Sequence, residues 1–303
     1  MSSVSTGSHS HPGASSGPRL FPSSIRRILC PTDLSEASDA AFGHACLVAE
    51  CVDAELTLYH SIDLRQVART VGHHAPMAEA LRRAELDAVR HLEMCAARTS
   101  ALTRVTVDYG LSPHQAVAAA IAARLPDLTV MSTHGRRGIA HLLKGSVAET
   151  AIEDGGRPIL CVRGREQGPA LPYRRLLVPT DLRSREAFPL GALLARAFRA
   201  EVVALHVVPF ARASLSGVPQ ALEASVPEEA EVLRFLQPEF HGLPVTARVE
   251  LGPGWENIPS IAGEEGCDLI VMSTHRHDSL ADRMLGSRAE RIVTLAPCPV
   301  LVI

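Results

Sequence analysis

The chain has 303 residues, a formal net charge of −3 and only 4% aromatic residues. A near-neutral charge of mixed signs predicts neither a nucleic-acid partner nor an anionic membrane surface, and so few aromatics argue against a base-stacking surface. No uncharged apolar stretch approaches the roughly 20 residues of a membrane span, so no membrane association is expected. The seven cysteines show no Cys-x-x-Cys spacing and mostly lie in apolar runs, so we expect reduced core thiols in a cytoplasmic protein.

The first part of the chain repeats in the second part. The segment IRRILCPTDL at 25–34 returns as YRRLLVPTDL at 173–182, and KGSVAE at 144–149 returns as LGSRAE at 285–290. Echoes in the same order, about one domain length apart, indicate a duplicated unit. The chain is therefore interpreted as two copies of one domain.

The repeat also sets the domain boundaries. Residues 1–24 are rich in Ser, Gly, Pro and His and contain no apolar signal core, so they are predicted to be a disordered tail. One domain is predicted over 25–163 and a second over 173–303. The segment 164–172 between them has glycine and proline but no periodicity, and it is predicted to be a linker.

Short apolar runs alternate with helical patterns in the first copy, which is typical of an α/β fold with a parallel sheet covered on both faces. The predicted strands are 26–31, 54–60, 103–109, 127–132 and 158–162. The predicted helices are 36–50, 77–98, 113–124 and 146–153. Ser35 is expected to cap the first helix, and Pro113 suits the first turn of the third.

The second copy follows the same order. Its predicted strands are 175–179, 201–207, 245–250, 268–273 and 299–302. Its predicted helices are 184–199, 227–237, 255–264 and 287–295. The last strands of the two copies, 158–162 and 299–302, are both expected at sheet edges, where an exposed strand invites pairing.

Two segments of the first copy carry the predicted chemistry. The Pro-Thr-Asp segment at 31–33 follows the first strand, and a glycine-containing loop at 132–135 follows the fourth and leads to a helix start at 145–148. In an open parallel sheet, ligands bind beyond the carboxyl ends of the strands where the winding reverses. Glycines let the backbone approach an anion, and the N–H groups of a helix start then face it. The pattern predicts a phosphate site that is neither a Walker loop nor a dinucleotide Gly-x-Gly-x-x-Gly.

These segments resemble the universal stress protein family, as two tandem copies over 25–303. The family motif is Gly-x-x-Gly, nine residues, then Gly-Ser or Gly-Thr, and the first copy reads Ser132-Thr-His-Gly135, nine residues, Gly145-Ser146. The resemblance implies two open parallel five-stranded sheets of order 3-2-1-4-5, with the site between strands one and four. It also implies that the last strands of the two copies pair and form a pseudo-dimer within one chain.

The resemblance further implies an ATP site in the first copy. ATP-binding members hold adenine and ribose near the Pro-Thr-Asp segment and the end of strand two, and hold the phosphates on the glycine loop. The matching residues here are Pro31, Thr32, Asp33, Ser61, Met131, Ser132, His134, Gly135, Gly145, Ser146 and Val147. Asp33 would accept a hydrogen bond from a ribose hydroxyl or help to hold a hydrated Mg²⁺.

The second copy departs from the motif. Ser273 repeats the small change at Ser132, but Arg276 replaces the second glycine. Its side chain would occupy space that phosphate oxygens need, although an arginine could also donate to a phosphate. The residues matching a weaker second site are Pro179, Thr180, Asp181, Val207, Gly286 and Ser287. We therefore expect one competent site, in the first copy.

Simpler structural interpretations stay open. Asp33 and Asp181 could be helix caps, and Gly145 with Ser146 could be a turn followed by a cap. His60 and His206 close the second strand of each copy and are interpreted as core or sheet-edge residues. The histidines at 9, 11, 73 and 74 match no structured metal-ligand spacing and are interpreted as flexible surface residues.

Three functions stay open as well. The first is a stress-response protein in which ATP is a regulatory ligand, and the second is a dimeric interaction module that binds no nucleotide, as in family members without the glycine pattern. The third is a slow ATPase, for which no poised base can be named, so an enzymatic role is not the leading expectation. Further association of whole chains into a homodimer is also open.

Overall fold

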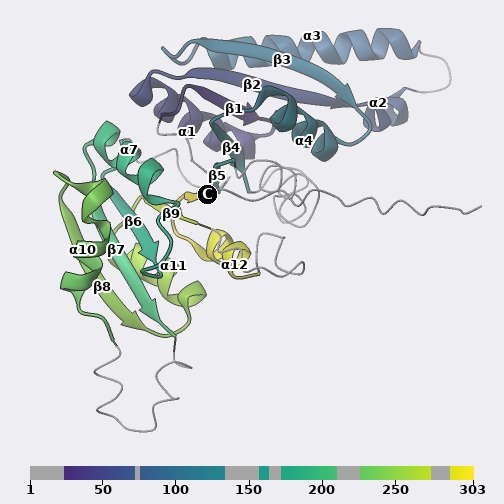
Figure 1. Ribbon diagram of the computed structural model, residues 1–303. Coiled ribbons are helices and arrows are strands. Elements are labelled where there is room, and N and C mark those ends of the chain that lie inside the picture. The colour runs from purple at the N-terminus through teal and green to yellow at the C-terminus, as the bar shows by residue number, and fades with distance from the viewer. Residues whose placement is uncertain (1–23, 72–75, 134–156, 164–171, 210–225, 274–286) are drawn as a thin grey trace, which may run out of the picture.

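The computed structural model describes residues 24–71, 76–133, 157–163, 172–209, 226–273 and 287–303. Over these ranges strands alternate with helices in both halves of the chain, and the predicted α/β class is confirmed (Figure 1). None of the helices in these ranges combines the length and the hydropathy that a membrane crossing requires. Residues 1–23, most of the predicted tail, lie outside the described ranges.

The first half follows the predicted element order closely. Its strands are β1 (Arg27–Pro31), β2 (Glu55–Asp63), β3 (Thr103–Gly110), β4 (Leu128–Ser132) and β5 (Ile159–Val162). Its helices are α1 (Glu36–Val52), α2 (Leu64–Thr70), α3 (Met77–Ala96) and α4 (Pro113–Arg124). Helix α2 was not predicted, because seven residues are too few to show a helical period. The predicted helix 146–153 lies outside the described residues.

The second half repeats the arrangement. Its strands are β6 (Arg175–Thr180), β7 (Glu201–Val208), β8 (Val245–Leu251), β9 (Leu269–Met272) and β10 (Val300–Val302). Its helices are α7 (Phe188–Phe198), α10 (Glu229–Phe240), α11 (Gly254–Glu264) and α12 (Ser287–Leu295). The predicted start of the first of these helices at 184 was wrong by a turn. Pro189 lies in the first turn of α7, where its missing N–H costs the helix nothing.

All these strands join in one ten-stranded sheet of order β3-β2-β1-β4-β5-β10-β9-β6-β7-β8. The neighbouring strands are parallel except β5 and β10, which pair antiparallel with Leu301 opposite Leu160. The two predicted five-stranded sheets are therefore joined into one through β5 and β10. The C-terminus lies beside β5 at the junction of the halves (Figure 1), and the last strands pair as the resemblance implied.

Two hydrophobic clusters cover the two faces of the sheet. The first contains side chains of α1, α3, α7 and α10, and the second contains side chains of α4, α11 and α12. Along β1, Ile28 and Cys30 belong to the first cluster while Leu29 belongs to the second. This alternation follows from the two-residue period of a strand, and apolar residues on both faces explain the continuous apolar runs of the sequence.

The helices of the two halves also meet at the junction. His44 of α1 is buried, and its Nδ1 lies 2.5 Å from the hydroxyl of Tyr173, which is also buried. The Tyr173 ring packs edge-on against Phe198 of α7, with 4.9 Å between ring centroids. Burial lowers the pKa of His44 from 6.5 to about 4. A neutral imidazole is therefore part of the contact between the halves.

One local contact shows how closely the copies agree. The Asp127 carboxylate accepts hydrogen bonds from the backbone N–H groups of Arg26 and Arg27, both at 3.0 Å. In the second half the Asp268 carboxylate accepts hydrogen bonds from the corresponding backbone N–H groups, those of Arg174 and Arg175, with distances of 2.7 and 3.1 Å. Each aspartate directly precedes the fourth strand of its copy, and its hydrogen bonds join the start of that strand to the start of the first strand.

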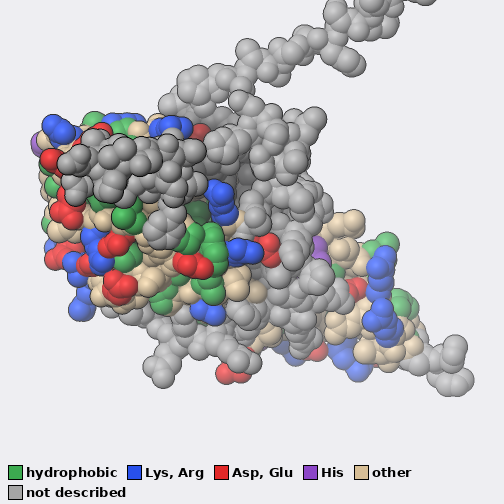
Figure 2. Space-filling view, turned by 90° about the horizontal axis from the view of Figure 1, so that it is seen from below, with side chains coloured by type: hydrophobic (Ala, Val, Ile, Leu, Met, Phe, Trp, Pro, Cys, Tyr) green, Lys and Arg blue, Asp and Glu red, His purple; other side chains and the backbone are tan. Residues whose placement is uncertain are grey.

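The thiols and the surface charges agree with the composition. All seven cysteines are free thiols, mostly buried, but Cys51 is exposed and is an exception to the expected core thiols. Acidic and basic side chains are mixed over the described surface seen in Figure 2. Arg248 pairs with Glu250 at 2.6 Å and with Glu265 at 2.9 Å. Such partly exposed pairs stabilise a fold by about 1 kcal/mol or less each.

Candidate functional site

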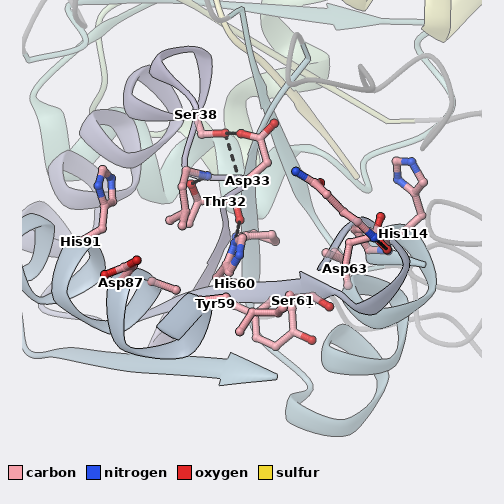
Figure 3. Close-up of a pocket in the computed structure, with 18 of the residues that line it drawn as sticks. Thr32, Asp33, Ser38, Tyr59, His60, Ser61, Asp63, Asp87, His91 and His114 are labelled. Atoms are coloured by element: carbon pink, nitrogen blue, oxygen red, sulfur yellow. Dashed lines mark hydrogen bonds between the residues drawn. The ribbon is translucent and has the colours of Figure 1, made fainter. Parts of the chain in front are cut away.

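A cavity of about 710 Å³ lies at the carboxyl ends of β1, β2 and β4 in the first half. Side chains of α2, α3 and α4 complete its walls (Figure 3). The predicted site residues that line it are Pro31, Thr32, Asp33, Ser61, Met131 and Ser132. Strand β1 has β2 on one side and β4 on the other, so the winding of the sheet reverses here. The structure thus places a ligand-sized cavity where an open parallel sheet binds its ligands.

The remaining predicted residues of this site are His134, Gly135, Gly145, Ser146 and Val147, and they lie outside the described residues. In the weaker second site Gly286 lies outside them too, and Ser287 begins α12. Pro179 and Thr180 end β6, Asp181 follows them, and Val207 lies in β7. The second-site residues that are described therefore occupy the same positions in the second half as their counterparts in the first.

The backbone turn after β1 is held by the end of β2. The Thr32 N–H donates to the Tyr59 carbonyl at 2.9 Å, and His60 Nδ1 lies 2.8 Å from the Thr32 carbonyl oxygen. The Thr32 hydroxyl accepts from the Leu34 N–H at 3.0 Å, and Leu34 adopts a left-handed φ of 58°. A bulky residue rarely adopts this φ, so the turn is held by its surroundings. His60, interpreted from sequence as a core or sheet-edge residue, fixes this turn beside the cavity.

Asp33 is oriented by the serines that follow it. Its Oδ1 accepts from the Ser38 hydroxyl at 2.6 Å and from the Ser35 N–H at 3.0 Å, and the Ser35 hydroxyl also donates to it. Ser35 therefore stands at the start of α1 without capping it through its side chain, contrary to the sequence-based expectation. Because these donors hold the Asp33 carboxylate in place, the carboxylate is already oriented before a ligand binds.

Ser61 offers the cavity a buried polar group. It is 7% exposed, it lines the cavity, and its Oγ makes no hydrogen bond with the described residues. Gly110 lies beside it: a Cβ there would be 3.1 Å from Ser61 Oγ. A buried hydroxyl without a partner costs about 1–3 kcal/mol. A ligand atom that hydrogen-bonds with Ser61 would remove this cost.

The outer walls of the cavity were not predicted from the sequence. The missed lining residues with polar side chains include Tyr59, His60, Asp63, Gln66, Asp87, His91 and His114. Asp63 accepts from the backbone N–H groups of Arg65 at 2.9 Å and Gln66 at 3.3 Å, and so caps α2. An aspartate directly after an apolar strand was the available signal for this helix.

The described walls are acidic rather than basic. Three aspartates and three histidines line the cavity, and no lysine or arginine is among its described lining residues. Carboxylates and ring nitrogens suit the hydroxyls and ring donors of a nucleoside or a cation, whereas a polyphosphate needs donors and positive charge. The described part of this site therefore suits hydroxyl groups, ring N–H donors or a cation better than it suits phosphates.

Comparison with known proteins identifies the family. The sequence model of the universal stress protein family matches residues 24–163 and 172–303. Universal stress protein MJ0531 of Methanocaldococcus jannaschii is 33% identical over 139 residues, covering 43% of this chain and 82% of that protein. Universal stress protein A homolog 1 of Coxiella burnetii is 29% identical over 139 residues, covering 43% of this chain and 96% of that protein.

A solved structure shows the same fold over nearly the whole chain. A universal stress protein from Archaeoglobus fulgidus matches with a TM-score of 0.64 at 19% identity, covering 93% of this chain and 97% of that chain. A functionally unknown protein, PA1789 from Pseudomonas aeruginosa, matches with a TM-score of 0.59 at 16% identity, covering 93% of each chain. The chain belongs to the universal stress protein family, with two copies of the family domain in tandem.

Proposed function

We propose that the first half binds an adenine nucleotide, ATP with Mg²⁺, as a regulatory ligand in a stress response. The observation that carries this proposal is the cavity of about 710 Å³ at the switch point of the sheet, next to the start of the glycine motif. Its size suits a drug-sized ligand, and the Pro-Thr-Asp segment, Ser61 and Ser132 all line it. In this proposal, binding biases the conformation of the chain or its choice of partner.

The two parts of the nucleotide would meet different chemistry. The acidic described walls would hold adenine and ribose, with Asp33 and Ser61 as hydrogen-bonding partners. The phosphates would lie on the segment that follows Ser132, where the sequence supplies glycines, Gly145-Ser146 and the cations of Arg136 and Lys144. Asp33 could also hold a hydrated Mg²⁺, because carboxylate oxygens suit that ion.

The test is titration calorimetry of the full chain with ATP and Mg²⁺ after bound nucleotide has been removed. We expect one binding event per chain. Ser61→Val installs the residue that the second half carries at 207, and the loss of one hydrogen bond should weaken binding about tenfold. Val207→Ser is the matched control and should leave the affinity unchanged. An equal effect of both variants would contradict the assignment of the site to the first half.

The remaining outcomes separate the alternative functions. No detectable heat with ATP, and no change when Gly145 is replaced by a bulky residue, would remove the proposal and favour a dimeric interaction module. Phosphate release above the background of the Gly145 variant would favour a slow ATPase. Adenosine as a second titrant shows how much of the affinity comes from the described walls, since it lacks the phosphates.

A further inference from the structure

Three potential metal ligands from two helices meet beside the candidate nucleotide cavity. The ligand atoms of Asp39, His91 and Cys95 all lie within 4.8 Å of one another. Asp39 belongs to the first turn of α1, and the other two are four residues apart on α3, which puts them on one side of that helix. No local spacing in the sequence predicted this cluster, because α1 and α3 are distant along the chain.

We propose that Asp39, His91 and Cys95 form a zinc site with an open fourth position. Carboxylate oxygen, imidazole nitrogen and thiolate sulfur are the three ligand types that Zn²⁺ takes. Bonds of about 2.0–2.3 Å place tetrahedral ligands about 3.5 Å apart, so the three side chains need to close by roughly 1 Å. Mg²⁺ would not choose this set, because it prefers oxygen ligands. The site is therefore distinct from any magnesium bound with a nucleotide.

The surroundings fit an accessible rather than a sealed site. Cys95 is buried in the core layer, His91 is half-buried and Asp39 is exposed, so the cluster runs from the core to the surface. His91 also lines the cavity, and Asp87 lies one helical turn before it on the same wall (Figure 3). A zinc-bound histidine commonly donates its second ring N–H to a carboxylate, and in this proposal Asp87, four residues earlier on the same helix, would accept it.

One cation lies next to the cluster. Burial raises the pKa of the Cys95 thiol, the Asp39 carboxylate raises it further, and the nearby Arg98 guanidinium lowers it. The Arg98 guanidinium also lies 5.5 Å from the centre of the Phe42 ring on α1. When a metal binds the Cys95 sulfur, the guanidinium can retain this cation–π contact with the Phe42 ring.

Co²⁺ is the probe that tests the site, since a thiolate ligand produces a charge-transfer band that carboxylate and imidazole ligands do not. The metal-free, reduced full chain is titrated with Co²⁺ and then with Zn²⁺, without nucleotide. We expect one equivalent of Co²⁺ to give the thiolate band and Zn²⁺ to abolish it. Because the histidines at 9, 11, 73 and 74 contain no sulfur, Co²⁺ absorption without the thiolate band would overturn the proposal.

Variants complete the test. Cys95→Ser should remove the band. Asp39→Ala, at an exposed position that does not threaten folding, should weaken Co²⁺ binding by at least about 100-fold, because even the loss of a residue that only supports a ligand costs about 10–100-fold. The controls Cys51→Ser, an exposed thiol of α1, and His114→Gln, a cavity histidine of α4, should keep the band. A band that survives in Cys95→Ser, or that is lost in Cys51→Ser, would overturn the proposal. Because no nucleotide is present, failure here leaves the ATP proposal standing, and the reverse also holds.

Discussion

The two halves share a backbone but differ in the side chains around the turn after the first strand. In both halves a Pro-Thr-Asp-Leu segment ends in a left-handed leucine, with φ of 58° at Leu34 and 60° at Leu182. In both, the threonine hydroxyl accepts from the leucine N–H, at 3.0 and 3.1 Å. Duplication has thus kept a rarely populated backbone conformation, which indicates that the turn itself is required in each copy.

The residues that follow the turn have diverged. The first half continues with Ser35 and Ser38, whose hydroxyls donate to Asp33, whereas the corresponding positions of the second half are Arg183 and Glu186. Asp181 instead accepts from the backbone N–H groups of 183 and 184, both at 2.9 Å. Two serine hydroxyls and one backbone N–H therefore hold the carboxylate in the first copy, whereas two backbone N–H groups hold it in the second.

The helices over this end of the sheet differ in the same way. Ala187 stands where the first half has Asp39, and the next residue, Phe188, packs edge-on against Phe235 and Phe240 at 5.7 and 5.6 Å between centroids. The first half has the polar cluster of Asp39, His91 and Cys95 in the corresponding layer. Aromatic packing stabilises the second half, whereas the first half keeps groups that can bind ligands. We therefore expect both the nucleotide and the zinc site in the first half.

The strand pair that joins the halves gives the largest expected effect. Leu301 of β10 is fully buried, and Leu301→Ala should lower the free energy of unfolding by about 3 kcal/mol, because it leaves a cavity between the halves. In thermal unfolding followed by calorimetry, both halves should unfold in one transition, and Leu301→Ala should move that transition to a lower temperature. Leu58→Ala, in β2 and away from the junction, is the control and should move the same transition. Two transitions, with Leu301→Ala affecting only one, would contradict a shared core.

The glycine motif is expected to set the difference in nucleotide affinity. Gly135→Arg gives the first copy the residue that the second copy carries at 276, and it should weaken ATP binding about 100-fold, or about 2.7 kcal/mol. The physical reason is a side chain in the space that phosphate oxygens need. Calorimetry of the full chain measures the change, with Arg276→Gly as the matched variant. Unchanged ATP affinity in Gly135→Arg would show that this loop does not cause the difference in nucleotide affinity between the two copies.

The contact between His44 and Tyr173 predicts a pH dependence. Because the pKa of His44 is lowered from 6.5 to about 4, the folded chain binds fewer protons than the unfolded chain between these values. Stability from this group is present above pH 6.5 and is lost as the pH falls, by about 2 kcal/mol between pH 7 and pH 5. Urea unfolding at both pH values measures it, and His44→Phe should reduce the difference by that amount. An identical pH dependence in His44→Phe would refute the assignment.

The smallest expected effect concerns Asp33. Ser38→Ala removes the hydroxyl that donates to the carboxylate at 2.6 Å and should cost about 1 kcal/mol of stability. Ser184→Ala is the control in the second half, where the carboxylate is held by backbone N–H groups, and should cost less than about 0.5 kcal/mol. Equal losses in urea unfolding would mean that the two carboxylates are held alike, against the structure.

Local patterns predicted most of the fold because they act within short windows. The apolar runs predicted the strands to within a few residues, and the Pro-Thr-Asp repeat predicted which turns lie at the site. Helix α2 was not predicted because it is short, and the predicted start of α7 was too early because Pro189 favours the first turn of a helix. The role of His60 also escaped, since a histidine in a strand shows its partner only when the neighbouring strand is in place.

The sequence by itself determined the duplication, the α/β class and the position of the turn that bears Asp33, because these depend on repeats, periodicity and turn chemistry that neighbouring residues share. Only the tertiary structure decided the walls of the cavity, the joining of β5 to β10 and the meeting of Asp39 with His91 and Cys95. These features bring together segments that are distant along the chain, and the packing of helices on the sheet places them, which no local pattern records.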